Sequence, residues 1–249
     1  MASRRTRRAR GIVLDRTKLG EQDLILTLLI QSGERVSVVA RGARKPGGRL
    51  AARCELFSET DFLLARGRGL EVVAEASLVE SHSGIRGDLA RVSAASAVCE
   101  VASLTSFDDA PDPFLYPLCS RVLRACEEAR DQQGLDVAVA AYVFKVLAHG
   151  GWFAQLGSCV LCGDQSRSYF SATSGGALCS SCAKDVPDAI EMGPSELKWI
   201  DAFIRSTFDE LVLASIDMGM STKLLGVAHT WAATHLDARL RSMEFMLSL

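Results

Sequence analysis

Two pairs of closely spaced cysteines constrain the fold of this chain more than any other feature. Cys159 and Cys162 form one C-x2-C pair, and Cys179 and Cys182 form a second pair after sixteen intervening residues. A two-residue gap lets both thiolates of a pair turn onto one ion, and four thiolates match the tetrahedral preference of Zn²⁺. The spacing therefore predicts a four-cysteine zinc ribbon at about residues 157–187 that holds one structural Zn²⁺.

Other interpretations of these cysteines stay open at this stage. They can form two disulfides, bind nothing, or hold a catalytic zinc. A catalytic site leaves one coordination position for water, whereas four cysteines close the sphere. The zinc deaminase signature needs H-x-E and P-C-x-x-C, but His149 has no Glu two residues later and Ser158 precedes Cys159. We therefore expect a structural zinc and no enzyme, with a zinc-dependent nucleic-acid enzyme as the weaker alternative.

Four further cysteines lack pair spacing, and we expect them to be small core residues. They are Cys54, Cys99, Cys119 and Cys126.

The charge of the chain is unevenly distributed. The net charge is −2, yet residues 1–70 contain 15 Lys and Arg against 7 Asp and Glu, a net charge of +8. This excess predicts a basic module that binds the phosphate backbone of nucleic acids. A solubilising tail is the alternative for the first ten residues alone. Phe57 and Phe62 are the two aromatic residues in this part of the sequence. Both occupy strand-like positions where we expect burial, so the grip should be electrostatic with little base stacking.

The candidate DNA-binding residues are all basic and lie in the first fifty residues of the chain. They are Arg4, Arg5, Arg7, Arg8, Arg10, Arg16, Lys18, Arg35, Arg41, Arg44, Lys45 and Arg49.

The hydrophobic pattern divides the chain into a β part and a helical part. Five strand-like runs lie between residues 11 and 80, and "QSGE" joins two of them as a hairpin turn. This pattern predicts an OB-fold barrel over residues 11–82, preceded by a flexible basic arm, residues 1–10. A Pro/Gly-rich connection, residues 43–52, is expected to be exposed and mobile.

Helical periodicity begins near residue 86 and continues to the C-terminus, interrupted by the cysteine segment. The fold class is therefore α+β, an N-terminal five-stranded OB-fold barrel followed by a mainly helical domain, residues 83–249, with the zinc ribbon inserted. Asp112 and Pro113 are the expected N-cap and first residue of one helix. The stretch from Leu135 to Trp152 is apolar on nearly all sides, which predicts a buried helix.

We expect a cytoplasmic, nucleoid-associated protein without a membrane anchor. The apolar run Leu24–Ile30 is far shorter than the roughly 20 residues of a membrane span. The basic start is followed by an apolar stretch that stops at Asp15, which is too short for a signal peptide.

The order of these features resembles the RecO family of bacterial DNA recombination and repair proteins. The likeness is carried by "GIVLDRTKLGEQDLILTLLIQSGERVSVVARGARKPGG", "GLEVVAEASLVE", the helical stretch with "FLYPLCSRVL", and "CVLCG…YFSATSGGALCSSC". The resemblance covers roughly residues 10–240. It implies an OB-fold, a helical body, and a metal site at the four paired cysteines.

The resemblance also implies a function. RecO-like proteins bind single- and double-stranded DNA, anneal complementary strands, and help RecA load onto coated single strands. They act with RecR and with the C-terminal tail of the single-stranded DNA-binding protein. That tail is acidic and ends in apolar residues, so its receptor needs a cation beside an apolar groove. Arg121 and Arg124 are candidates for it, and an ordinary solvated helix face is the alternative. The competing function is a zinc-ribbon scaffold whose main role is protein docking.

Overall fold

A computed structural model describes residues 6–249 of the chain. The described part divides into two compact units, one that ends at Glu127 and one that begins at Glu128. Each unit is considered separately below. No helix among the described residues is long and apolar enough to cross a membrane.

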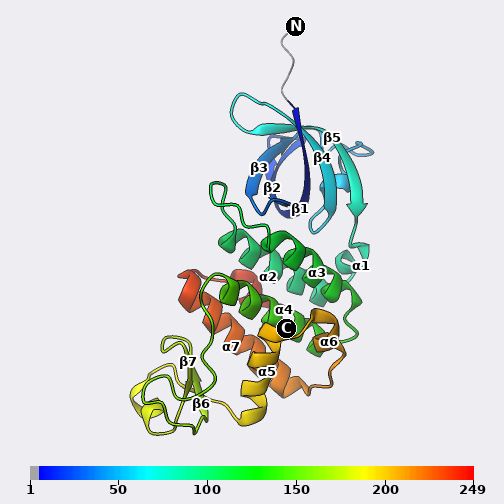
Figure 1. The fold of residues 1–249 in the computed structure, drawn as a ribbon. Coiled ribbons are helices and arrows are strands. Elements are labelled where there is room, and N and C mark those ends of the chain that lie inside the picture. The colour runs from blue at the N-terminus through cyan, green and yellow to red at the C-terminus, as the bar shows by residue number, and fades with distance from the viewer. Residues whose placement is uncertain (1–5) are drawn as a thin grey trace. The chain divides into compact units, whose positions relative to one another are not determined.

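The first unit contains a closed five-stranded barrel, which Figure 1 shows. Its strands are β1 (Thr6–Leu19), β2 (Asp23–Ile30), β3 (Arg35–Ala40), β4 (Glu59–Ala65) and β5 (Glu71–Glu80). They close in the order β1-β2-β3-β5-β4. All neighbours are antiparallel except β3 and β5, which pair in parallel through Val38 with Glu71 and Val39 with Val72. The predicted five-stranded barrel is confirmed.

Alternating apolar residues fill the barrel. In β2, Leu24, Leu26 and Leu28 point into the core, where they meet Val38 of β3 and Phe62 of β4. Phe57 is buried as well, so the expectation that the two N-terminal aromatics are buried is confirmed. The predicted "QSGE" turn joins β2 and β3, and Gly33 within it has a φ of +89°, in the left-handed region that favours glycine.

The predicted start of the first strand was wrong. β1 begins at Thr6 rather than Gly11, and residues 6–12 pair with β4 from Ala65 to Glu59. Residues 6–10 are therefore part of a strand, not of a flexible arm. Their sequence lacks apolar alternation because it holds arginines whose side chains pair with acids elsewhere on the barrel, Arg7 with Glu71 of β5 and Arg10 with Asp61 of β4. Arg4 and Arg5 lie outside the described residues.

Three helices complete the first unit: α1 (Ser83–Arg86), α2 (Leu89–Thr105) and α3 (Leu115–Glu128). The Asp88 carboxylate caps α2 by accepting a hydrogen bond from the Arg91 N–H at 2.9 Å. α3 begins two residues after the predicted Pro113. The Asp112 carboxylate nevertheless accepts a hydrogen bond from the Phe114 N–H at 3.0 Å, in the turn that precedes the helix.

The four cysteines without pair spacing are buried, as predicted. They are Cys54 beside the barrel core, Cys99 on α2, and Cys119 and Cys126 on α3.

The second unit is built around α4 (Gln132–His149), which is buried on nearly all sides as predicted. α5 (Pro194–Arg205), α6 (Phe208–Leu213) and α7 (Met218–Leu236) pack on it, and α8 (Arg241–Met246) follows. Phe144 of α4 stacks on Phe203 and Trp231, with ring centroids 6.1 and 5.8 Å apart.

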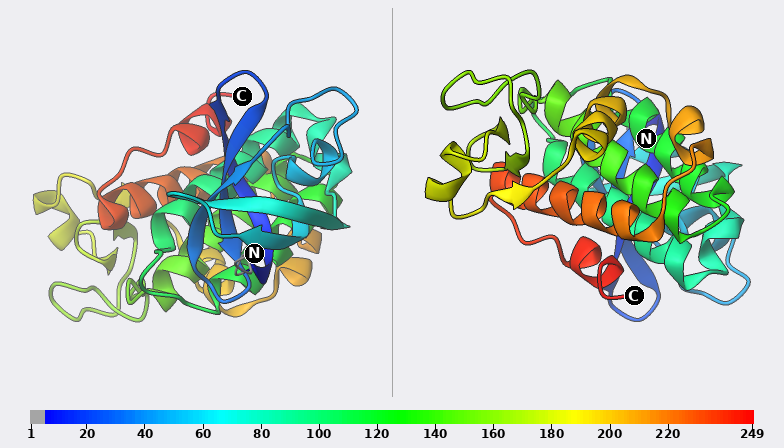
Figure 2. Two further views of the ribbon diagram at one scale, coloured as in Figure 1. Left: turned by 90° about the horizontal axis from the view of Figure 1, so that it is seen from above. Right: turned by 90° about the horizontal axis from the view of Figure 1, so that it is seen from below.

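The cysteine segment interrupts these helices as a small β element. Strands β6 (Tyr169–Ser171), β7 (Gly176–Leu178) and β8 (Ile190–Glu191) form a sheet in the order β7-β6-β8. β6 lies within "SYFS", and Gly175 takes a positive φ in the turn before the second cysteine pair. The segment, yellow-green in Figure 2, lies to one side of the helices of its own unit.

Candidate metal centre and nucleic-acid interface

The four paired cysteines meet at one point. Cys159 and Cys162 lie in a turn, Cys179 directly follows β7, and Cys182 begins a short 3-10 helix, Cys182–Asp185. Their four sulfur atoms lie within 4.8 Å of one another. The sulfurs of Cys162 and Cys179 are 3.7 Å apart, and tetrahedral Zn²⁺ with Zn–S bonds of about 2.3 Å requires sulfurs roughly 3.8 Å apart. The donor set and its spacing therefore fit one metal ion.

A hydrogen-bonded backbone turn follows the first cysteine of each pair. The N–H of Gly163 donates to the Cys159 carbonyl at 2.8 Å, and the N–H of Ala183 donates to the Cys179 carbonyl at 3.0 Å. Burial raises the pKa of the Cys159 thiol, but backbone N–H groups of Cys179, Cys162 and Leu161 outweigh it and lower the pKa to about 6. Hydrogen bonds to the charged form stabilise the thiolate of Cys159, which is the form that binds metal. Contacts with the thiols of Cys162 and Cys179 instead raise the pKa of Cys182, to about 12.

The apolar core of this segment is small. It contains Leu178 and Ala183 besides the buried cysteines, with Val160, Tyr169 and Val186 packed partly against it. Such a core stabilises little structure by itself. A metal ion held by the four cysteines would therefore stabilise the segment, and four protein ligands leave no open position for catalysis.

Several predicted DNA-binding arginines already have partners on the barrel. The Arg7 guanidinium lies 2.7 Å from the Glu71 carboxylate and 3.8 Å from that of Glu34. Arg10 forms two hydrogen bonds with Asp61, at 2.8 and 2.9 Å. This pairing lowers the pKa of the Asp61 carboxyl. Arg10 thus neutralises an acid of the neighbouring strand β4, and Arg7 neutralises one at the start of β5.

Three more of the predicted residues make local contacts. Arg16 lies 2.8 Å from the Glu55 carboxylate. Arg35 donates to the Ser103 carbonyl of α2 and lies 3.7 Å from Asp108. Arg44 donates to the Glu21 carbonyl at 2.9 Å and to that of Gly20 at 3.3 Å. These guanidiniums support the barrel and its loops.

The connection between β3 and β4 is a run of hydrogen-bonded turns. In each turn a backbone N–H donates to the carbonyl three residues earlier, at 2.9 to 3.1 Å. The pairs are Lys45 with Gly42, Gly48 with Lys45, and Ala51 with Gly48. The Asp23 carboxylate accepts from the Gly42 N–H at 2.7 Å, which joins this connection to the turn between β1 and β2. The predicted basic loop is therefore anchored at its start.

The remaining basic residues of that loop line a hollow beside β5. Arg41, Lys45 and Arg49 border a cavity of about 800 Å³ whose other wall is β5 from Val73 to Ala76. All three side chains are exposed, and no ion pair joins them to any residue that the structure describes. We call this hollow the basic groove. Arg53, which also lines it, was absent from the predicted contact residues.

Arg8 and Lys18 lie elsewhere on the barrel. Arg8 lines a second hollow, of about 670 Å³, over the outer face of β1, β4 and β5. Arg10, Asp61 and Glu75 also line it, so its charges balance. Lys18 is exposed near the end of β1. Of the predicted residues, Arg41, Lys45 and Arg49 are thus the three that combine exposure with a shared hollow.

The predicted partner residues Arg121 and Arg124 are exposed on α3. In the second unit, the structure adds a different groove of about 610 Å³. Its lining includes Phe153, Leu156 and Leu197 together with Lys198 and Arg167. Phe153 is 41% exposed. No sequence pattern indicates this groove, because its walls are far apart along the chain.

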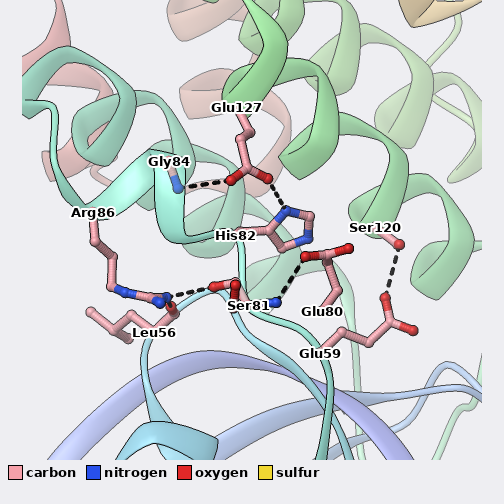
Figure 3. Close-up of polar contacts among 9 residues, drawn as sticks. All are labelled: Leu56, Glu59, Glu80, Ser81, His82, Gly84, Arg86, Ser120 and Glu127. Atoms are coloured by element: carbon pink, nitrogen blue, oxygen red, sulfur yellow. Dashed lines mark hydrogen bonds and ion pairs between the residues drawn. The ribbon is translucent and has the colours of Figure 1, made fainter.

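A polar cluster that no sequence pattern indicates connects α3 to the segment after β5 (Figure 3). His82 is buried, and its Nδ1 lies 2.9 Å from a Glu127 carboxylate oxygen. The other oxygen of Glu127 accepts from the Gly84 N–H at 2.8 Å, and Glu80 accepts from the Ser81 N–H at 2.9 Å. Arg86 donates to the Ser81 carbonyl at 2.6 Å. These bonds fix the helices of the first unit to the end of β5.

Comparison with known proteins agrees over both parts of the chain. The family model described as Recombination protein O N terminal matches residues 1–82, and the one described as Recombination protein O C terminal matches residues 86–244. A protein of Bifidobacterium longum (strain DJO10A), named DNA repair protein RecO, is 32% identical over 241 residues, which cover 96% of this chain and 98% of that protein. Proteins with the same name from Thermoanaerobacter sp. (strain X514) and Listeria monocytogenes (serotype 4a, strain HCC23) are 27% and 29% identical, over 96% and 86% of this chain. The alignments cover 96% and 82% of those two proteins.

Proposed function

Because the chain belongs to the RecO family of DNA repair proteins, we propose that it is a DNA-binding recombination mediator that acts without catalysing a reaction. It binds single- and double-stranded DNA, anneals complementary strands, and helps the RecA recombinase load onto single strands coated by single-stranded DNA-binding protein. RecR is its expected partner, and the nucleoid its expected location in the cell. The observation that carries the DNA-binding step is the basic groove, with three exposed cations that have no acidic partner among the described residues.

Annealing requires that phosphate repulsion between two strands be screened while the bases stay free to pair. Arg41, Lys45 and Arg49 supply the screening charge. Phe57 and Phe62, the aromatics of the barrel sequence, are buried in its core, so they offer no stacking platform that would hold the bases. The proposed grip is therefore on phosphates and has little sequence preference.

The proposed cofactor is one structural Zn²⁺, held by Cys159, Cys162, Cys179 and Cys182. Its support is the four-thiolate donor set with sulfur spacing that suits tetrahedral coordination. The ion would stabilise the segment between α4 and α5 rather than take part in strand annealing.

Annealing of two fluorescent complementary oligonucleotides tests the proposal. The protein should accelerate pairing at low salt, both on bare strands and on strands coated with single-stranded DNA-binding protein. Replacing Arg41, Lys45 and Arg49 with Gln removes up to three phosphate contacts, which weakens single-strand binding about 100-fold at 0.1 M salt. The same variant should lose most of the acceleration, since annealing depends on that binding.

A control variant replaces Arg130 and Lys184, two exposed cations of the second unit, with Gln. It should anneal like the unaltered protein. Acceleration that is absent with and without the coating protein, or that survives in the groove variant, refutes the proposed function.

The groove of the second unit favours a docking role besides DNA binding. The tail of single-stranded DNA-binding protein is acidic with an apolar end, and this groove combines Phe153 and Leu156 with the cation of Lys198. Arg167 and Arg205 also line the groove but have local partners, the Leu156 carbonyl at 2.6 Å and the Asp201 carboxylate at 2.8 Å. We therefore propose Lys198 as an alternative receptor cation to the predicted Arg121 and Arg124.

Fluorescence polarisation of a labelled acidic peptide with an apolar C-terminal end separates the two receptor sites. Lys198→Glu should weaken binding at least tenfold if the groove is the receptor, whereas Arg124→Glu should do so if α3 is. Unchanged affinity in both variants removes both sites.

A further inference from the structure

The loop between β4 and β5 borders a hollow that continues the basic groove. This hollow has a volume of about 640 Å³ and is lined by Arg66, Arg68 and the start of β5. It shares three lining residues with the basic groove, Arg41, Val73 and Ala74. The two hollows are therefore neighbours along β5, and Arg41 lies where they meet.

The loop presents its two arginines to solvent. Arg66 and Arg68 are both exposed, and neither forms an ion pair with a residue in the described part of the chain. Gly67 between them makes the turn possible, because a Cβ there would overlap the Leu70 carbonyl oxygen. The tight turn spaces the two charges two residues apart at one rim of the hollow.

The acid nearest to this rim in the sequence is already neutralised. Glu71 begins β5, and its carboxylate accepts hydrogen bonds from Arg7, at 3.1 Å from Nε and 2.7 Å from Nη2. Arg7 therefore masks a negative charge that would otherwise repel phosphate. Glu75, an acid on β5, lines the basic groove. Its carboxylate therefore repels phosphate in that groove rather than at the β4–β5 loop.

We propose that the β4–β5 loop is a second phosphate-binding rim, and that a DNA strand passes from Lys45 and Arg49 across β5 at Val73 and Ala74 to Arg66 and Arg68. Arg41 contacts the strand at the crossing. This inference rests on the proposed function, because it extends the DNA path from one hollow into the next. It adds Arg66 and Arg68 to the candidate DNA-binding residues and gives Arg7 an indirect role, to position the path by masking Glu71.

Equilibrium binding of a fluorescent oligodeoxythymidine, measured by anisotropy over a series of salt concentrations, tests the inference. Each lost phosphate contact reduces the slope of log K against log salt by about 0.7 for a single strand. Arg66→Gln with Arg68→Gln should therefore flatten the slope by about 1.4 and weaken binding about 25-fold at 0.1 M salt. The control with Arg130→Gln and Lys184→Gln removes the same charge from the second unit and should leave the slope unchanged.

The outcomes separate the inference from the proposed function. If the loop variant has an unchanged slope while the variant of Arg41, Lys45 and Arg49 has a flatter one, the second rim is refuted and the basic groove remains. If neither variant changes the slope, the groove itself is not the DNA site. A flatter slope in both, with the control unchanged, supports the continuous path. Circular dichroism of each variant establishes that it is folded.

Discussion

The turn between β2 and β3 packs so closely against another segment that adding one methyl group, by a Gly→Ala substitution, should disturb the contact. Gly33 has a φ of +89°, and a Cβ there would lie within 3.0 Å of backbone atoms of Asp112. The Arg35 N–H also donates to the Phe107 carbonyl at 3.3 Å. The turn therefore lies directly against the connection between α2 and α3, within the first unit.

We predict that Gly33→Ala destabilises this contact strongly. A left-handed conformation costs an alanine roughly 1 kcal/mol, and overpacking adds about 1–3 kcal/mol. Gly20→Ala is the matched control, because Gly20 has a φ of +61° and nothing within 4 Å of its Cβ position. The two variants share the cost of backbone strain and differ in the collision.

Hydrogen exchange of peptides that cover β2 and β3 measures the difference. Exchange in Gly33→Ala should be about 5- to 150-fold faster than in Gly20→Ala, which corresponds to roughly 1–3 kcal/mol. Equal exchange in the two variants would refute the contact between the turn and the α2–α3 connection.

Three further predictions concern the metal centre and two carboxylates. Cys179→Ser should reduce the bound metal, measured by elemental analysis, from one ion per chain to none. The control Cys126→Ser, which changes a cysteine of the core, should retain one ion per chain. Metal retained in Cys179→Ser counts against the site. Burial raises the pKa of Asp136, which accepts hydrogen bonds from Gln132 and Ser221. The pKa of Asp136 in the folded state therefore lies above its unfolded-state value of about 3.9. As pH rises from the unfolded-state pKa through the folded-state pKa, the protein should lose stability relative to Asp136→Asn. A difference in the free energy of urea unfolding that does not change with pH would contradict this. Despite partial burial, which opposes the shift, hydrogen bonds from His82 and Gly84 lower the pKa of Glu127. Glu127→Gln should therefore cost about 1.5 kcal/mol at neutral pH, and the loss should shrink as pH falls below the unfolded value of about 4.3; equal stability of the two proteins at pH 7 would show that the pair contributes nothing.

The sequence predicts those parts of the fold that depend on local patterns. Alternation of Leu24, Leu26 and Leu28 identifies β2, because one face of a barrel strand is buried. The ribbon follows from cysteine spacing, because a metal site needs only four ligands at set positions. α4 follows from an apolar run too long for a strand.

The fate of the arginines depends on neighbours that the sequence does not specify. Arg10 pairs with Asp61, and Arg7 with Glu71, 51 and 64 residues away. The pair of Arg10 and Asp61 exists because β1 extends to Thr6 and lies beside β4 in the closed barrel. Glu71, the partner of Arg7, lies on β5, one strand beyond β4. Counting charges therefore overstates the positive surface. Arg66 and Arg68 are included in the count for residues 1–70, but they were not among the candidate DNA-binding residues. The pair of His82 and Glu127 escapes prediction for the same reason, since it joins residues 45 positions apart.

We propose that DNA lies in the basic groove beside β5 and that the metal centre has a structural role. Ultraviolet crosslinking to an oligonucleotide that contains 4-thiothymidine, followed by mass spectrometry of the peptides, tests it most directly. We predict crosslinks in peptides that contain Arg41, Lys45 and Arg49, and in those of β5. Crosslinks confined to the cysteine segment, residues 157–187, would contradict the account.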